Sequence, residues 1–575
     1  MSGTVSKGHV PIICVLYYIL QPYNKSLIEN QNKRTRSGKM DKFVEHPLIK
    51  PKTMQSRLYQ EAMLGEAVKK HLLCVLPTAL GKTNVAIMLA AHRLKEFPGS
   101  MVIILAPTRP LVGQHFITFK KFMNLPEDDF QILTGLVKPV EREMLYKEKT
   151  IIFATPQTVQ KDLENNRLSL KEFSLIVADE AHHSVGRYAY PYVVKRYIEE
   201  AEHPRILGLT ASPGGTSEKI KEICSNLGID AVEIRTEQDS DVMPYVKEKE
   251  MEWVYVDLPE SFLKIKRLVE GTYKKRIESL RKMRYIHRRY ASKRDLLELQ
   301  KRLINSIKQG NKKAFSGMSY TTQAIKLEHA MGLLETQGVN VMEKYWSKIR
   351  AEDTNTARRL VNNKDVSAAM LLTQELVHEG SSHPKMAKLC SIVVEQLAKK
   401  QDPKIIIFAN FRESVRQIAS ALEKQERAMP VGGKDGLDRA DKAIRPVMLV
   451  GQKEGLTQKE QMDVIKRYNE GEYNCLITTS IGEEGLDIPA MDLAIFYEPV
   501  PSEIRSIQRR GRVGRQKIGR IIVLITRGTR DEAYRWSAYH KERRMHRALH
   551  GMKQAQKQEN SKSTTFDKQQ TIGDF

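Results

Sequence analysis

Continuous runs of apolar residues alternate with helical stretches over residues 55–236. Runs that are apolar at every position are typical of strands covered by helices on both faces of a parallel sheet. The runs are HLLCVL (71–76), MVIILA (101–106), TIIFAT (150–155), FSLIVA (173–178) and RILGLT (205–210). The pattern therefore predicts an α/β domain built on a parallel sheet.

The same rhythm returns over residues 383–535. Its apolar runs are KIIIFAN (404–410), VMLVG (447–451), YNCLITT (473–479), LAIFYEP (493–499) and RIIVLIT (520–526). Because strands separated by helices pair in parallel through crossover connections, a second α/β domain is expected.

Between these two regions, over residues 258–378, the strand pattern stops and the period is helical. Residues 261–350 hold 22 Lys and Arg against 7 Asp and Glu. A solvated helix surface is the simpler interpretation of a charged run, but this excess is too one-sided for pairing between successive helical turns. We therefore expect the segment to be a helical insert that contacts nucleic acid.

The composition supports a folded protein with a polyanionic partner. Of the 575 residues, 41% are hydrophobic and 28% are charged, enough for sizeable cores. The net charge of +25 favours nucleic acid ahead of anionic membrane. Five scattered cysteines without a Cys-x-x-Cys pair argue against a disulfide framework or a zinc site, and fit a reducing cytoplasm.

One apolar stretch lies near the N-terminus, at residues 10–20. It is shorter than the ~20 residues that span a bilayer, and no small-residue cleavage site follows it. Met40 opens the segment MDKFVEHPLIKP, which reads as a natural start. We therefore expect residues 1–39 to be an N-terminal extension from an upstream start, and the protein to have no membrane partner.

The segment LPTALGKTN (76–84) ends in a Gly-Lys-Thr between an apolar strand and a helical stretch. In that context the backbone N–H groups of the loop and of the helix start point at phosphates. Lys82 would reach the β- and γ-phosphates, and Thr83 would ligate Mg²⁺. Taken alone, the tripeptide also fits a chance occurrence, because Leu76 replaces the first glycine of a standard phosphate loop.

Two further segments complete the chemistry of a nucleotide site. FSLIVADEAHH places Asp179 and Glu180 after an apolar strand, where Asp179 suits Mg²⁺ and Glu180 can activate water. SIQRRGRVGRQ (506–516) can bring Arg512 and Arg515 from the second domain to a γ-phosphate. Hydrolysis would then require the two domains to close.

The segments LPTALGKT, DEAH, TAS (210–212), TTSIGEEGLDIP (478–489) and QRRGRVGR, in this order, resemble the motif set of superfamily 2 helicases and translocases. APTRPLVGQH (106–115), GLTASPG (208–214) and the basic insert are similar to the archaeal Hef helicases and their eukaryotic FANCM relatives, which act on forked and branched DNA. The resemblance covers residues 45–550 and implies two RecA-like domains that use ATP and Mg²⁺.

The resemblance assigns roles to further residues. It implies that Gln60, in RLYQ, reads the adenine. It places near the nucleotide Thr78, Ala79, Gly81, Lys82, Thr83, Gly485 and Asp487. It assigns contacts with the sugar–phosphate track to Pro107, Thr108, Arg109, Gly135, Thr155, Pro156, Arg412 and Thr479. Thr210 and Ser212 resemble the element that couples hydrolysis to domain movement, and Gln508 lies where the family senses the γ-phosphate.

The family also explains the unusual phosphate loop. Superfamily 2 helicases lack its first glycine, so Leu76 is no objection. Ala79 stands where the family often has glycine. If its φ is positive, alanine costs on the order of 1 kcal/mol, and we expect a strained but working loop.

These interpretations divide the chain into six parts. They are the extension (1–39), the first RecA-like domain (40–245), the helical basic insert (246–380), the second RecA-like domain (381–540), a disordered polar tail (541–568) and a clamp-binding motif (569–575). The last part reads QQTIGDF, in which Gln569, Ile572 and Phe575 resemble the box that docks sliding clamps of the PCNA type.

The resulting prediction is a cytoplasmic, nucleoid-associated archaeal DNA helicase or translocase that acts on forked or branched DNA in repair. Nothing after residue 550 supplies the XPF-like nuclease of larger Hef proteins, so a separate nuclease is a candidate partner. Two alternatives stay open. One is a double-stranded RNA translocase of the Dicer or RIG-I type, and the other is a clamp-associated DNA-binding scaffold with weak ATPase activity.

Overall fold

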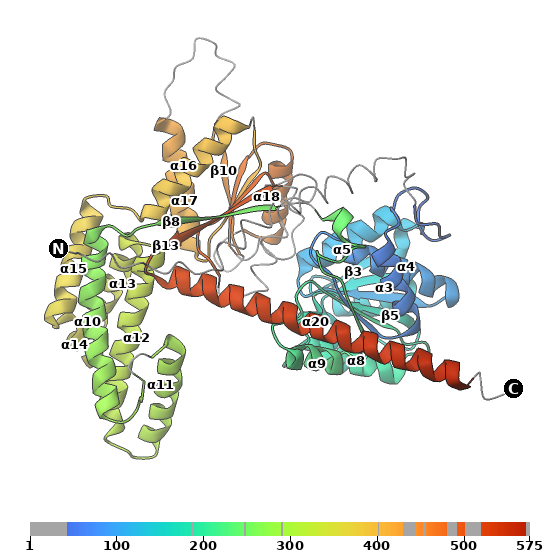
Figure 1. Cartoon of the computed structure of the whole chain (residues 1–575), viewed down its shortest axis with the longest axis horizontal. Helices are drawn as coiled ribbons and strands as arrows, with labels where there is room; N and C mark the ends of the chain where they lie inside the picture. The colour runs from blue at the N-terminus through green and yellow to red at the C-terminus, as the bar shows by residue number, and fades with distance from the viewer. Residues whose placement is uncertain are drawn as a thin grey trace, which may run out of the picture.

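The computed structural model describes residues 43–186, 188–246, 249–288, 291–400, 402–428, 443–451, 456–479, 491–500 and 519–570. Two parallel sheets and a helical bundle make up this part of the chain (Figure 1). The predicted fold class, two RecA-like parallel-sheet domains with a helical insert between them, is confirmed.

The first sheet has seven parallel strands in the order β3-β4-β2-β5-β6-β1-β7. Its strands are β1 (Leu72–Val75), β2 (Met101–Leu105), β3 (Phe130–Leu133), β4 (Ile151–Ala154), β5 (Phe173–Ala178), β6 (Ile206–Thr210) and β7 (Ala231–Ile234). The five predicted runs form the five inner strands. The two edge strands, β3 and β7, were missed because each carries half-exposed residues where the inner strands are fully buried.

Helices cover both faces of this sheet. They are α3 (Leu58–Lys69), α4 (Lys82–Glu96), α5 (Arg109–Phe122), α6 (Pro139–Glu148), α7 (Pro156–Glu164), α8 (Ala189–Glu200) and α9 (Ser217–Asn226). Successive residues of β1 point to opposite faces: Leu72 and Cys74 join the core under α3, α4 and α5, while Leu73 and Val75 join the core under α7, α8 and α9.

The second sheet has six parallel strands in the order β10-β11-β9-β12-β13-β8. They are β8 (Lys249–Val256), β9 (Ile405–Phe408), β10 (Pro446–Leu449), β11 (Cys475–Thr478), β12 (Leu493–Phe496) and β13 (Gly519–Thr526). The helices of this domain include α16 (Pro384–Lys399), α17 (Arg412–Ala428) and α18 (Gln458–Asn469).

Strand β8 corrects one predicted boundary. Residues 249–256 were assigned to the helical insert, but they pair along their whole length with β13 at the edge of the second sheet. The strand carries Glu250 and Glu252 among its apolar residues, so it lacks the continuous apolar run of an inner strand. The helical part of the insert begins at Glu260, with α10.

The insert is a bundle with its own apolar core. Its helices are α10 (Glu260–Lys282), α11 (Lys293–Lys308), α12 (Ala314–Thr336), α13 (Val339–Ala351), α14 (Asn355–Val361) and α15 (Lys364–His378). Trp346 of α13 is among the largest fully buried side chains, which shows that this basic segment folds around a real core.

The segment predicted to be a disordered tail is a helix instead. Helix α20 spans Arg530–Gln570, and Figure 1 shows it running from α12 and β13 to α8 and α9. Met545 and Leu549 are buried in the core of the first domain. The two residues lie one helical turn apart in a strongly charged segment, so the apolar stripe that they form is narrow. The surface against which this stripe packs lies more than 300 residues earlier in the chain.

The start of α20 is fixed to both the second sheet and the insert. The side chains of Lys385, on α16, and Asp531 form an ion pair and are 0% exposed. Asp531 also accepts the backbone N–H of Thr526, at the end of β13, at 3.0 Å. Arg530 pairs with Glu328 at 3.1 Å and with Glu335 at 3.4 Å on α12. None of the helices in the described ranges has the length and apolar character of a membrane span.

We expect Asp531→Ala to lower the free energy of unfolding by about 3–5 kcal/mol, because it leaves the Lys385 ammonium buried without a counter-charge. Urea unfolding followed by circular dichroism measures the change as a lower transition midpoint. The exposed pair Lys275–Asp365 provides a matched control, and Asp365→Ala should leave the midpoint within error. Replacing both buried partners, as Lys385→Met with Asp531→Leu, should recover most of the loss. Equal effects of the buried and exposed substitutions would contradict the assignment.

Candidate active site and nucleic-acid interface

Loops that follow the strands of the first sheet carry nearly all residues with predicted roles in that domain. The loops after β5, β6 and β1, neighbours in the sheet, carry the DEAH segment, residues 210–212 and the phosphate loop. The loops after β3, β4 and β2 carry the residues predicted to hold the sugar–phosphate track. Because the strands are parallel, all these loops leave from one edge of the sheet. The strand order thus divides this edge into a nucleotide half (β5, β6, β1) and a track half (β3, β4, β2).

The phosphate loop adopts the strained backbone that its sequence suggested. Ala79 has a φ of 67° and Gly81 a φ of 78°, so both lie in the left-handed region. Two buried side chains of α3 hold the loop from behind. The hydroxyl of Tyr59 donates to the carbonyl of Leu80 at 2.8 Å, and Nε2 of Gln60 donates to the carbonyls of Leu80 and Gly81 at 3.0 and 3.3 Å. Helix α4 then begins at Lys82, which presents its N-terminal N–H groups to the loop.

Gln60 has one side-chain oxygen, Oε1, that is available for its predicted role in binding the adenine. The side chain is 1% exposed, and its Oε1 is buried without a hydrogen-bond partner among the residues the structure describes. A buried polar atom in this state is costly, and a ligand that donates a hydrogen bond would satisfy it. The exocyclic amine of an adenine is such a donor.

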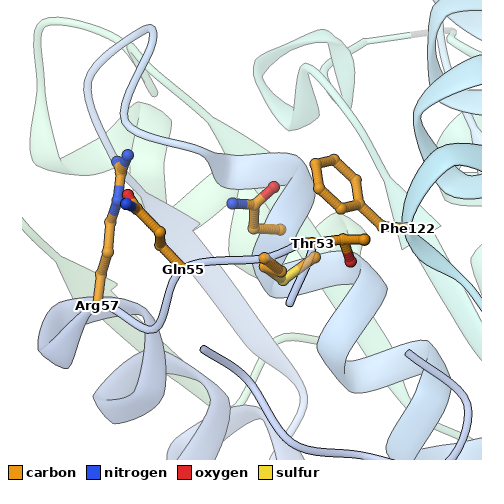
Figure 2. A pocket seen from close by; sticks show the side chains of 6 residues that line it. Thr53, Gln55, Arg57 and Phe122 are labelled. Atoms are coloured by element: carbon orange, nitrogen blue, oxygen red, sulfur yellow. The ribbon is translucent and has the colours of Figure 1, made fainter. Parts of the chain in front are cut away.

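A cavity of about 220 Å³ adjoins this site (Figure 2). It is lined by Thr53, Met54, Gln55, Arg57, Asn84 and Phe122. Figure 2 shows the side chains of Gln55 and Arg57 together on one side and Phe122 on the other. Asn84 connects the cavity to the phosphate loop, because its Nδ2 would lie 3.2 Å from a Cβ placed on Gly81.

These cavity residues were missed in the sequence, apart from the RLYQ segment that contains Arg57. They lie in the segment before α3, on α4 and on α5, so no short sequence motif contains all of them. An amide, a guanidinium and an aromatic ring around an open hollow suit a planar nucleobase. Together with the orphaned oxygen of Gln60 and the phosphate loop, they fit an adenine nucleotide.

The two acidic residues after β5 are held by several partners. Nε2 of His115, on α5, donates to Oδ2 of Asp179 at 2.7 Å, and the hydroxyl of Tyr190 donates to the backbone carbonyl of Asp179 at 2.6 Å. His115 follows β2 and Asp179 follows β5, so this bond joins the track half to the nucleotide half. Glu180 has a φ of 48°, in the left-handed region.

Positive groups determine the charge state of Glu180. Burial alone would raise its pKa, but Lys82 and a hydrogen bond from His182 outweigh that effect and hold the pKa well below its ordinary value. Nδ1 of His182 lies 3.3 Å from Oε2 of Glu180. Glu180 is therefore a carboxylate at neutral pH, placed beside the ammonium of Lys82.

The predicted coupling residues contact this carboxylate through one histidine. Nδ1 of His182 also lies 3.2 Å from Oγ1 of Thr210, and the N–H of Ser212 donates to that Oγ1 at 3.1 Å. His182 was not predicted as a site residue, although it is the histidine of the DEAH segment. Its spacing from Glu180 gave no reason to select it over the adjacent His183.

The described residues hold no group of three or more His, Cys, Asp and Glu side chains arranged to bind a metal ion. Thr83 and Asp179 stay the Mg²⁺ ligands predicted from the sequence. Mg²⁺ usually binds through one or two protein ligands and completes its octahedron with phosphate oxygens and water. The donor set therefore fits a metal that arrives with a nucleotide.

In the track half, the structure brings two of the predicted residues, Arg109 and Gly135, into contact. Nη2 of Arg109 would lie 3.5 Å from a Cβ placed on Gly135, so the guanidinium packs against that glycine. The hydroxyl of Thr155 is buried and bonds to that of Thr158 at 2.8 Å, and Pro156 begins α7. The Thr155 side chain is thus engaged inside the protein, so its predicted contact with nucleic acid would have to come from the backbone of this loop.

In the second domain the structure describes two of the predicted residues. Arg412 begins α17 after β9, and Thr479 follows β11, the neighbour of β9, where it is 8% exposed. Gln569 falls at the end of α20. The other predicted residues lie outside the described part: Gly485, Asp487, Gln508, Arg512, Arg515, Ile572 and Phe575.

The insert presents part of its positive charge to solvent. Five basic residues around the end of α11 and the following turn are exposed, and no ion-pair partner for them is found within the described residues. They are Lys301, Arg302, Lys308, Lys312 and Lys313. Unpaired, exposed cations of this density suit a phosphate backbone.

A core of two parallel-sheet domains, with a phosphate loop and a DEAH segment at one sheet edge, defines a superfamily 2 helicase. Three family models match in chain order: the DEAD/DEAH box helicase at residues 53–220, an RNA-helicase helical bundle at 262–376, and the helicase conserved C-terminal domain at 384–517. The crystal structure of the Pyrococcus furiosus Hef helicase domain is 41% identical and superposes with a TM-score of 0.65, covering 84% of this chain and 98% of that one. The chain belongs to the Hef and FANCM family of helicases.

Curated relatives match most of this chain. A Methanocaldococcus jannaschii protein named as an ATP-dependent RNA helicase is 41% identical over 515 residues, which cover 89% of this chain and 63% of that protein. The Schizosaccharomyces pombe ATP-dependent DNA helicase fml1 is 30% identical, over 87% of this chain and 60% of that protein. The chain thus spans less than two thirds of the length of either relative.

We expect Ala79→Gly to raise the free energy of unfolding by about 1 kcal/mol, because glycine adopts a positive φ without the Cβ clash. Thermal unfolding of the nucleotide-free protein measures the change. Gly81→Ala is the opposing control: it adds strain at a φ of 78°, and its Cβ would lie 2.5 Å from Nε2 of Gln60. It should destabilise the protein and weaken ATP binding. A destabilising Ala79→Gly would contradict the strain at this position.

We expect Glu180→Gln to lower kcat for ATP hydrolysis at least ~100-fold while KM for ATP stays within about threefold, as for loss of a group that activates water. Because the pKa of Glu180 lies below its ordinary value of 4.5, the carboxylate form is fully present above that pH and is lost only as the pH falls through the lower, folded-state value. A pH profile of kcat/KM, which reports the groups of the free enzyme, should therefore show no carboxyl titration between pH 5 and 8. A Glu180→Gln enzyme with unchanged kcat would rule out this role.

Proposed function

We propose that the chain is an ATP-dependent DNA helicase or translocase. The observation that carries this proposal is the divided edge of the first sheet. The nucleotide half and the track half adjoin at β2 and β5, where His115 and Asp179 are bonded at 2.7 Å. A nucleic-acid strand bound by the track half would thus lie against the half of the site that contains Asp179, a predicted Mg²⁺ ligand.

In the proposed site, ATP supplies the free energy for movement along the strand. Gln60 and the cavity beside it hold the adenine, and the phosphate loop with Lys82 holds the phosphates. Thr83 and Asp179 ligate Mg²⁺, and Glu180 orients water. While Lys82 neutralises Glu180, the carboxylate is a weak base. Once the ammonium is shared with a phosphate, Glu180 becomes more basic and better suited to accept a proton.

The second domain contributes the remaining parts of the proposed mechanism. Arg512 and Arg515 would stabilise charge on the γ-phosphate and Gln508 would sense it, while Gly485 and Asp487 would lie near the nucleotide. Arg412 and Thr479 would continue the track of Arg109 and Gly135. Closing and reopening of the domains would then move the strand.

The comparisons support DNA as the substrate, and the helical insert supports a branch or fork. The relative fml1 is named as a DNA helicase, and the Hef helicase domain is similar over nearly its whole length. In addition, the insert adds exposed cations outside both sheets, so a second duplex arm has a surface of its own. Phosphate contacts make such binding independent of sequence and steeply dependent on salt.

Two further partners are part of this proposal. The Gln569, Ile572 and Phe575 spacing supports docking on a sliding clamp of the PCNA type, and a separate nuclease would complement a helicase core. The relatives at 41% identity come from the archaea Pyrococcus furiosus and Methanocaldococcus jannaschii, which supports an archaeal, nucleoid-associated protein.

An RNA translocase is the second candidate. The Methanocaldococcus jannaschii relative is named as an RNA helicase, and the model that matches the insert is described as an RNA-helicase helical bundle. A clamp-associated scaffold with weak ATPase activity is the third, favoured by the strained Ala79 in the phosphate loop.

Steady-state ATP hydrolysis with forked DNA, linear duplex DNA and double-stranded RNA separates these candidates. We expect forked DNA to stimulate turnover most, and Lys82→Ala, which removes the phosphate contact, to abolish turnover with every nucleic acid. Because phosphate contacts release counterions, binding should weaken by at least ~100-fold between 50 and 200 mM salt. Stimulation by RNA alone would establish the RNA motor, and no stimulated turnover would establish the scaffold.

A further inference from the structure

A chain of polar contacts runs from the predicted catalytic carboxylate to the C-terminal helix. Glu180 contacts His182, which contacts Thr210, whose Oγ1 accepts the N–H of Ser212. The hydroxyl of Ser212 then donates to the thioether sulfur of Met545, on α20, at 3.1 Å. A helix that begins in the second domain thereby touches the predicted coupling element of the first.

The contact at Met545 is a packed interface rather than a surface encounter. Met545 and Leu549 are 2% and 4% exposed, and they belong to the same core cluster as Ala181, Ile220 and Ile223. Helix α20 lies against α9 and β7, and Figure 1 shows it passing α9. Ala181 directly follows Glu180, so the apolar contact and the polar chain reach the same loop.

The other end of α20 is equally fixed. Asp531 is paired with Lys385 of α16, and Arg530 with Glu328 and Glu335 of α12. The helix between Asp531 and Met545 is continuous, and 14 residues of α-helix span about 21 Å. A continuous helix of this length transmits a displacement of one end to the other with little bending.

We propose that α20 is a strut through which movement of the second domain and the insert repositions Ser212 and Thr210, and through them His182 and Glu180. Met545 is in this account a positioning residue. The coupling of domain movement to hydrolysis then has a second route, separate from any guanidinium that the second domain supplies. This inference rests on the proposed ATP hydrolysis for its functional meaning.

Two readouts test the strut. The first is amide hydrogen exchange of residues 208–214 in nucleotide-free protein, which reports how firmly Thr210 and Ser212 are held. The second is kcat for nucleic-acid-stimulated ATP hydrolysis, compared with KM for ATP. The variants are Met545→Ala, Leu549→Ala and Met545→Leu, which retains the packing but removes the sulfur acceptor. The matched control is His546→Ala, at the adjacent position of α20, where the side chain is 56% exposed.

We expect Met545→Ala and Leu549→Ala to speed exchange at residues 208–214 and to lower stimulated kcat, each about fivefold, with KM for ATP unchanged. Met545→Leu should shift both readouts in the same direction by a smaller factor. His546→Ala should match the parent protein. Exchange in the buried strands β1 and β5 should stay the same in all four variants, which separates loss of the strut from general destabilisation.

The outcomes are distinguishable. If the parent protein hydrolyses ATP and both alanine variants match His546→Ala in both readouts, the strut is overturned. If Met545→Leu matches the parent protein while both alanine variants differ from it, the hydrogen bond from Ser212 to Met545 is ruled out as the link between α20 and residues 208–214. If the parent protein has no ATPase activity, the proposed function fails, and the exchange readout still decides whether α20 holds residues 208–214. Should Met545→Ala not fold, Met545→Leu and Leu549→Ala decide between these outcomes.

Discussion

Parallel pairing of the first sheet is the constraint on which the site depends. Because every strand of a parallel sheet ends at the same edge, segments as distant in sequence as the phosphate loop and the DEAH loop become neighbours without any attraction between their own side chains. The strand order then decides which loops adjoin. Placing β2 beside β5 brings the track half against the nucleotide half, and a hydrogen bond between His115 and Asp179 links their side chains. Contact between the two halves is therefore a consequence of topology.

The inner strands of both sheets were predictable because burial on both faces leaves a continuous apolar run. The edge strands β3, β7 and β8 were not, since each has a solvent-facing side and carries polar residues that resemble loop or helix sequence. The same reasoning explains the misjudged C-terminal segment. Met545 and Leu549 pack against a surface of the first domain, whereas most of the residues around them in the sequence are charged or polar. The sequence near them therefore gives no sign of a buried helix face.

Site residues divide in a similar way. Lys82, Asp179 and Glu180 stand in contiguous motifs at strand ends, so their types and spacing were enough to predict them as site residues. The left-handed backbone of Ala79 could be anticipated, because a glycine position occupied by alanine is itself a signal. His182, Asn84 and Phe122 could not be identified, because their roles arise from neighbours that only folding brings near.

Strain at the site has to be maintained by its surroundings. Ala79 and Glu180 both adopt a positive φ, which costs on the order of 1–3 kcal/mol for each residue and persists only where neighbouring contacts determine the backbone. Tyr59 and Gln60 hold the loop after Ala79 through its carbonyls, and Tyr190 holds the carbonyl just before Glu180. His182 holds the Glu180 side chain and is itself held through Thr210. Since the last of these supports extends through Ser212 to α20, the contacts that hold Glu180 in its strained position reach a helix that begins in the second domain.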